Sequence, residues 1–189
     1  MKEKNKIFEL INQEKVDELF ACVFEQTLPN SDGKGTYTQV LTAEEETVLV
    51  RKMLTKNGHE ADPWLEFIQQ YSRKYPLSNR AVQVLLDHID DPKSIPLLID
   101  VLSAFGYNED QGIALCNFVL TDSQHPDVLR ILQLLYECAR VFSPDIYRLL
   151  EKIDGRVHEA GYSEQAQFAE SYKQAIESQR QIGNKRDFI

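Results

Sequence analysis

The sequence repeats a helix-start signal at intervals of about 34 residues, and this spacing constrains the fold more than any other feature. Four times, a turn or capping residue precedes a run of apolar residues at helical spacing. These starts are Thr42, Ser78, Asn108 and Ser143, which are separated by 36, 30 and 35 residues. A second start lies inside three of the units, at Asp62-Pro63, Asp91-Pro92 and His125-Pro126. A pair of short helices cannot bury its apolar side alone and must stack on a neighbouring pair. The spacing therefore predicts an all-α fold of stacked helical hairpins.

Capping signals place the individual helices of this predicted irregular, HEAT-like α-solenoid. Thr42 and Glu45 form a capping box, and Asp62 before Pro63 combines an N-cap with a first-turn proline. An amphipathic helix is predicted within residues 3–28, and an irregular connection with a short extended piece within 29–40. The remaining helices, which bring the total to about nine or ten, are expected near 42–56, 63–74, 79–90, 92–105, 110–121, 126–141, 144–158 and 163–181.

The distribution of apolar residues ranks these helices by depth. Helix 126–141 is apolar over most of its circumference and is predicted to be central, with Leu132 in the middle of its apolar face. The final helix is mostly polar, as expected for the cap of a repeat array. We therefore expect three parts: an N-terminal helical segment with its loop (1–40), helical-hairpin repeats (41–160), and a capping helix with a polar tail (161–189).

Composition favours a globular protein in a reducing compartment. Apolar residues make up 42% of the chain and charged residues 27%, which are globular values. No apolar stretch approaches the roughly 18 residues that a membrane span needs, and the N-terminus lacks the apolar core of a signal peptide. Cys22, Cys116 and Cys138 are odd in number and widely spaced, which indicates buried free thiols. These observations predict a cytoplasmic location.

The net charge of −9 is concentrated in the middle of the sequence. Between Ala81 and Leu129 there are eight acidic residues and one basic residue, Lys93. Such a stretch would repel a phosphate backbone, so nucleic acid is not an expected partner. Two interpretations stay open: the aspartates cap helices and form turns, or they form a surface that steers a partner with a basic surface.

Signals for catalysis, metals and cofactors are weak throughout the sequence. Gly33-Lys34-Gly35-Thr36 lacks the first glycine of a phosphate-binding loop, because Leu28 occupies that position. His158-Glu159 begins like a zinc-protease motif, but Tyr162 stands where the second histidine would be. The four histidines follow the repeat and mark helix ends. We therefore predict no catalytic residues, no metal site and no cofactor.

The part of the chain from about 76 to 155 resembles the degenerate Leu-rich helical repeats found in type IV secreted effector proteins of Legionella and related intracellular bacteria. The residues that carry the resemblance are Leu77-Ser78-Asn79-Arg80, Leu85-Leu86-Asp87-His88, Asp91-Pro92, Leu97-Leu98 and Leu102. It implies a bacterial effector, or the partner of an effector, that acts in a host cytosol. It also implies a polar, Glu-rich C-terminal secretion signal. Glu164, Glu170 and Glu177 are compatible with such a signal, whereas Lys185-Arg186 departs from it.

The function expected from these features is binding to another protein, because stacked hairpins present surface to partners. One candidate surface is the solvent-facing row on the second helix of each unit, represented by Asp100, Ser103, Arg130, Gln133 and Glu137. The other is the N-terminal amphipathic helix with Phe20 and Phe24, whose alternative role is to pack on its own first repeat. An all-α enzyme without a local motif is the alternative function, and the oligomeric state is left open.

Overall fold

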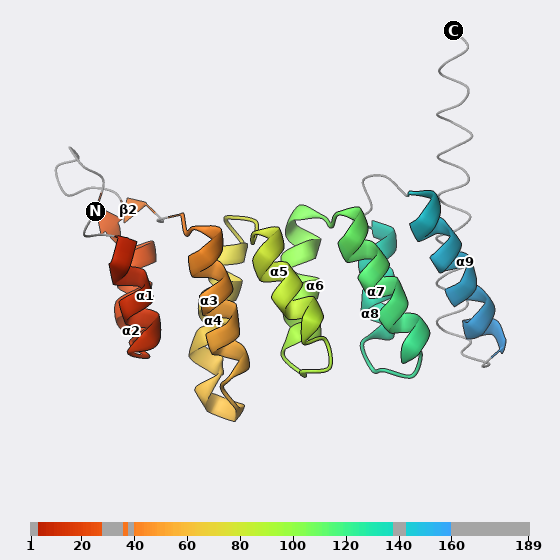
Figure 1. Ribbon diagram of the computed structural model, residues 1–189, viewed down its shortest axis with the longest axis horizontal. Helices are drawn as coiled ribbons and strands as arrows, with labels where there is room; N and C mark the ends of the chain where they lie inside the picture. The colour runs from red at the N-terminus through yellow and green to blue at the C-terminus, as the bar shows by residue number, and fades with distance from the viewer. Residues whose placement is uncertain (1–3, 28–35, 38–39, 138–142, 160–189) are drawn as a thin grey trace, which may run out of the picture. The chain divides into compact units, whose positions relative to one another are not determined.

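The computed structural model describes residues 4–27, 36–37, 40–137 and 143–159. These residues form nine α-helices, one short 3-10 helix and one antiparallel pair of two-residue strands, so the predicted all-α fold is confirmed (Figure 1). The elements are α1 Lys4–Asn12, α2 Val16–Phe24, β1 Gln26–Thr27, β2 Thr36–Tyr37, α3 Ala43–Leu54, η1 Gly58–Glu60, α4 Asp62–Ser72, α5 Asn79–Asp87, α6 Ser94–Phe105, α7 Glu109–Thr121, α8 Val128–Glu137 and α9 Pro144–Glu159.

Most helices begin within about two residues of the predicted starts because the capping residues act as expected. Thr42 accepts a hydrogen bond from the amide of Glu45, whose side chain accepts one in return from the amide of Thr42, which completes the capping box. Asn108 forms the same reciprocal arrangement with Gln111 at the start of α7. The helix predicted within 163–181 lies outside the described residues.

The N-terminal segment forms two helices, α1 and α2, where the apolar stripe alone indicated an amphipathic helix. The break is at Glu14, whose φ of 60° lies in the left-handed region. The amide of Glu14 donates to the carbonyl of Ile11, and the amide of Lys15 donates to the carbonyl of Leu10. This pattern closes a helix with a left-handed residue, a position that usually holds glycine.

Two lysines from α3 hold the side chain of Glu14 at this break. The Nζ atoms of Lys52 and Lys56 lie 2.7 Å and 2.6 Å from the Glu14 carboxylate. Hydrogen bonds and attraction to both lysines lower the pKa of Glu14 to about 2. Two ion pairs therefore connect the turn between α1 and α2 to the C-terminal end of α3.

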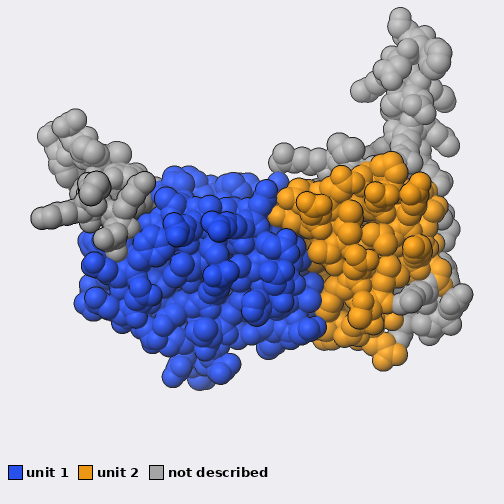
Figure 2. Space-filling model, viewed as in Figure 1, with its two compact units in different colours: residues 1–105 blue, residues 106–189 orange. Residues whose placement is uncertain are grey.

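The chain divides into two compact units, Met1–Phe105 and Gly106–Ile189 (Figure 2). In unit 1, three hairpins stack: α1 with α2, α3 with α4, and α5 with α6 (Figure 1). The first helices pack as one row, α1 on α3 and α3 on α5, and the second helices as another, α2 on α4 and α4 on α6. Thus α1 and α2 belong to the same compact unit as the hairpins between 41 and 105.

The core of unit 1 lies between these two rows. Its side chains come from both helices of each hairpin, and the most deeply buried include Leu19, Val23, Leu49, Val50, Met53, Phe67, Ile68, Leu85 and Leu98. The hydrophobic effect on these side chains is the main force that stacks the hairpins.

A buried polar network joins successive hairpins in unit 1. The Tyr71 hydroxyl accepts a hydrogen bond from the amide of Leu41 and donates to Glu46, at 2.9 Å and 3.2 Å. The other carboxylate oxygen of Glu46 accepts from the amide of Ser78, 2.7 Å away, at the N-cap of α5. Burial, with the nearby Glu46 charge, raises the pKa of Tyr71 well above its usual range. The network therefore fixes the offset between hairpins, because each buried polar group depends on a partner from the next element.

Unit 2 contains α7, α8 and α9, and α7 packs on both of the others. As predicted, α8 is deeply buried: Ile131, Leu132 and Leu135 have no exposed surface. Side chains crowd the backbone at Gly112 of α7, where a Cβ atom would lie 2.7 Å from both Ile146 Cδ1 and Tyr107 Cε2. Glycine at this helical position lets α9 pack against the backbone of α7.

Candidate protein-binding groove

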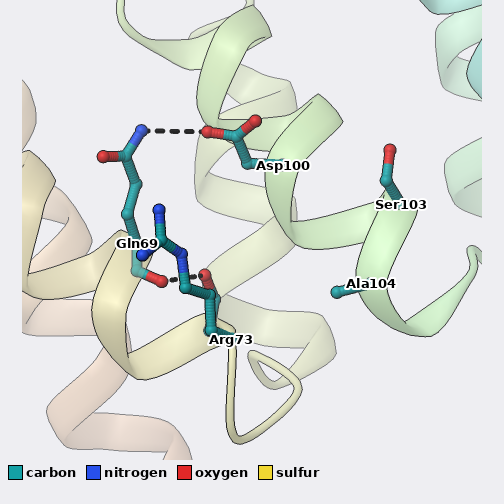
Figure 3. Close-up of a pocket in the computed structure, with 6 residues that line it drawn as sticks. Gln69, Arg73, Asp100, Ser103 and Ala104 are labelled. Carbon is teal, nitrogen blue, oxygen red and sulfur yellow. Dashed lines mark hydrogen bonds between the residues drawn. The ribbon is translucent and has the colours of Figure 1, made fainter.

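The structure brings together two of the predicted binding residues, Asp100 and Ser103, on the exposed side of α6. Their neighbours on α4 complete an open groove of about 380 Å³ between the second helices of two successive hairpins (Figure 3). The groove is lined by Gln69, Ser72, Arg73, Asp100, Ser103 and Ala104.

Small side chains are the reason that a groove exists at this place. The groove is lined by Ser72 at the end of α4 and by Ser103 and Ala104 near the end of α6. None of the three has enough volume to fill the space between two packed helices. The backbones can therefore pack while the surface above them stays hollow.

A hydrogen bond crosses the groove and holds its acidic group. The side-chain amide of Gln69 donates to Asp100 Oδ2 at 2.9 Å (Figure 3). Ser72 is only 3% exposed, and its hydroxyl donates to the backbone carbonyl of Gln69 at 3.1 Å. The Asp100 carboxylate is thus oriented by a neutral partner that leaves its charge in place.

Arg73 supplies the positive charge of the groove. It forms the C-cap of α4, where the helix dipole favours a cation, and its side chain is exposed. Within the described part of the chain, its guanidinium forms no ion pair, either with Asp100 or with another carboxylate. The groove therefore presents a guanidinium and a carboxylate that do not neutralise each other.

Phe20 and Phe24 pack on α4 within unit 1, in line with the alternative role given for the N-terminal helix. With Phe67 they form a cluster of three rings whose centroids are 5.0 to 5.3 Å apart. The Nζ atom of Lys74 lies 5.8 Å from the centre of the Phe24 ring, within the range of a cation–π contact. Both rings stay half-buried, and their packing joins α2 to α4.

The other predicted binding residues belong to α8 in unit 2. Arg130 and Gln133 are exposed, and Arg130 pairs with Asp127 one turn earlier at 3.1 Å. Glu137 ends α8, and its side chain lies outside the described residues. These residues thus belong to a different compact unit from the groove.

Several aspartates of the acidic middle have local structural roles. Asp91 accepts a hydrogen bond from the amide of Lys93 at 2.9 Å, and the Lys93 ammonium lies 3.0 Å from the same carboxylate. Asp87 accepts from Gln83 on the same helix at 2.8 Å. These contacts fit the turn and capping interpretation, whereas Asp100 lies mid-helix and contacts a different hairpin.

The described thiols and imidazoles have structural surroundings. Cys22 and Cys116 are buried, and burial raises the pKa of the Cys116 thiol to about 12. His88 Nδ1 lies 2.9 Å from the carbonyl of Val84, which fits the predicted place of histidines at helix ends. Cys138 and the His158 side chain lie outside the described residues. Within the described ranges, no group of three or more potential ligands is arranged to hold a metal ion.

Sequence reasoning missed the α4 side of the groove, Gln69 and Arg73. Their spacing of four residues places both on one face of α4, and Glu66 lies one turn before Gln69. This was a usable signal for a second polar row beside Asp100 and Ser103.

No protein-family model matches the chain, and no curated protein or solved structure is significantly similar to it. No helix in the described ranges is long and apolar enough to cross a membrane.

Proposed function

We propose that the chain is a protein-interaction module that binds its partner through the groove between α4 and α6. The observation that supports this is the groove itself: two residues chosen as a binding surface from the sequence, Asp100 and Ser103, line a hollow between stacked hairpins. Grooves and exposed helix faces of this kind are where helical repeats bind other proteins. Oriented polar groups at its rim provide specificity without a catalytic constellation.

We further propose that this binding belongs to a bacterial effector, or to a protein that binds one, acting in a host cytosol. The support is the resemblance to Leu-rich effector repeats. In α5 and α6 the leucines that carry it, including Leu85, Leu97 and Leu98, are buried core residues. A reporter fused to the chain should therefore enter host cells from a bacterium with an intact type IV system. Equal signals from a strain without that system would contradict this part of the proposal.

Site-directed photo-crosslinking tests the groove. Benzoylphenylalanine in place of Ser103 should give a discrete adduct in host-cell or bacterial lysate. The same probe in place of Gln83, which is exposed on α5 in the other row, should not. Identical adduct patterns from the two positions would contradict a binding site in the groove.

A steric block gives an independent check of the same site. Ala104→Trp should fill the groove and abolish the Ser103 adduct. Ala21→Trp is the matched control, because Ala21 is also an exposed alanine on a second-row helix but lies outside the groove. The adduct should survive Ala21→Trp.

An all-α enzyme is the alternative function. If the chain binds a metal ion or a nucleotide as part of a reaction, that ligand should raise the unfolding temperature in proportion to the logarithm of its concentration above Kd. A protein-interaction module is expected to show no such stabilisation by divalent metals or nucleotides.

A further inference from the structure

Asp100 stands at a position that helix stability alone does not favour. It lies in the middle of α6, between buried Ile99 and Val101, far from the helix N-terminus where aspartate is stabilising. It therefore has no capping role. Its described contact is with a neutral amide from α4, which orients one carboxylate oxygen and leaves the charge and the other oxygen for a ligand.

Arg73 offers the opposite charge at the rim of the same groove. A guanidinium presents a planar set of donors that can bind a carboxylate through two hydrogen bonds. Because Arg73 has no ion-pair partner among the described residues, an incoming carboxylate does not have to displace one. Elsewhere in unit 1, by contrast, Lys52 and Lys56 both form ion pairs with Glu14.

We propose that the groove recognises a segment of a partner protein that carries an acidic side chain and a basic side chain on one face. The acidic group binds Arg73 and the basic group binds Asp100. Small or apolar side chains between them lie against Ser103 and Ala104. This inference rests on the proposed function and adds the chemistry of the partner, since a uniformly basic surface would satisfy Asp100 but would be repelled by Arg73.

The openness of the groove favours a protein segment over a small zwitterion with the same two charges. Pockets for small ligands bury about 70–90% of the ligand surface. Here Arg73, Asp100, Ser103 and Ala104 are all exposed, so a small molecule would stay largely in water. A protein segment can add contacts along α4 and α6 that the groove does not provide.

A random library of 12-residue peptides displayed on phage, selected against the full chain, tests the proposal. Peptides whose binding is blocked by Ala104→Trp are those that occupy the groove. We expect these peptides to be enriched in sequences with both an acidic and a basic residue. Asp100→Lys and Arg73→Glu should each weaken their binding at least tenfold, because each change places like charges together.

Matched variants control for the change in net charge. Asp87→Lys makes the same change as Asp100→Lys, and Asp87 is also an exposed aspartate bonded to a glutamine amide. Arg51→Glu matches Arg73→Glu, since Arg51 is also exposed near the C-terminal end of its helix. Neither control should change peptide affinity. Circular dichroism would establish that all variants remain folded.

A second selection, against the Asp100→Lys variant, should keep the preference for acidic residues and lose the preference for basic ones. Groove-bound peptides without the charge pair, or with affinities unchanged by the two reversals, would overturn the inference and leave the proposed function intact. If selected peptides are insensitive to Ala104→Trp, or no peptide is selected, both ideas are contradicted. Stabilisation of the chain by millimolar glycylglycine without peptide binding would instead assign the groove to small zwitterions and overturn the inference.

Discussion

Replacing Gly112 with alanine should destabilise unit 2, although alanine is the better helix former. At an exposed position inside a helix, replacing glycine with alanine stabilises the protein by about 0.8–1 kcal/mol. At position 112 the added Cβ would lie 2.7 Å from both Ile146 Cδ1 and Tyr107 Cε2, closer than atoms in contact can approach. The Tyr107 ring cannot easily swing away, because its hydroxyl donates to the backbone carbonyl of Leu135.

Gly155 provides the control within the same unit. It lies in α9, and a Cβ atom there would meet nothing within 4 Å. Since both substitutions gain the same helix propensity, the difference between them isolates the packing cost. Overpacking costs about 1–3 kcal/mol. Gly155→Ala should therefore raise the free energy of unfolding. The free energy of unfolding of the Gly112→Ala variant should be about 1–3 kcal/mol lower than that of the Gly155→Ala variant.

Urea unfolding followed by far-ultraviolet circular dichroism measures both variants. Trp64, the only tryptophan in the sequence, is buried in α4, so its fluorescence reports on unit 1. The double variant Gly112→Ala/Ile146→Val should recover part of the loss, because it removes one of the two opposing atoms. Equal stability of the two alanine variants would refute the reasoning, since it would mean that α9 moves away from α7 without cost.

Three other perturbations test different forces in the fold. Leu132→Ala should lower the free energy of unfolding by about 2–5 kcal/mol, measured by urea unfolding, because this side chain is fully buried in α8; parent-like stability would contradict the central place of α8. The lysine partners of Glu14 lower its folded-state pKa from 4.5 to about 2. The contribution of ionised Glu14 to the free energy of unfolding is therefore fully present above pH 4.5 and is lost as the pH falls toward 2. Glu14→Gln should remove this part of the pH dependence in thermal melts, and a pH profile identical to that of the parent would count against the ion pairs. Asp91→Lys should cost about 0.5–1.5 kcal/mol in the same unfolding assay, because it removes the acceptor of the Lys93 amide, whereas Asp100→Lys, which removes no bond to a backbone amide, should cost less.

The sequence was sufficient to predict the helices because their signals are local. Thr42 and Asn108 act at their own helix ends, and apolar residues at helical spacing mark the buried faces. The break at Glu14 was not predictable in this way. A position with left-handed backbone conformation is usually recognised in a sequence by glycine or asparagine. Here the residue is a glutamate, and two lysines more than 35 residues away bind its side chain.

The groove could be predicted only in part, for a related reason. Asp100 and Ser103 were identified because they belong to the predicted solvent-facing row on the second helix of their unit. Their neighbours across the groove depend on how far one hairpin is shifted along the next, and the apolar pattern does not encode that shift. The shift is visible in the hydrogen bonds instead: Gln69 with Asp100 and Glu46 with Ser78 join residues 31 and 32 positions apart, close to one repeat.

The same geometry explains why the space between α4 and α6 is hollow. Stacking places a pair of second-row helices side by side at each junction, so each junction could in principle be hollow. At the first junction, Phe20 and Phe24 meet Phe67, and three rings fill the space. At the second, Ser103 and Ala104 leave it open. The repeat therefore determines where a groove can form, and the size of the side chains at each junction determines whether the space becomes core or binding surface.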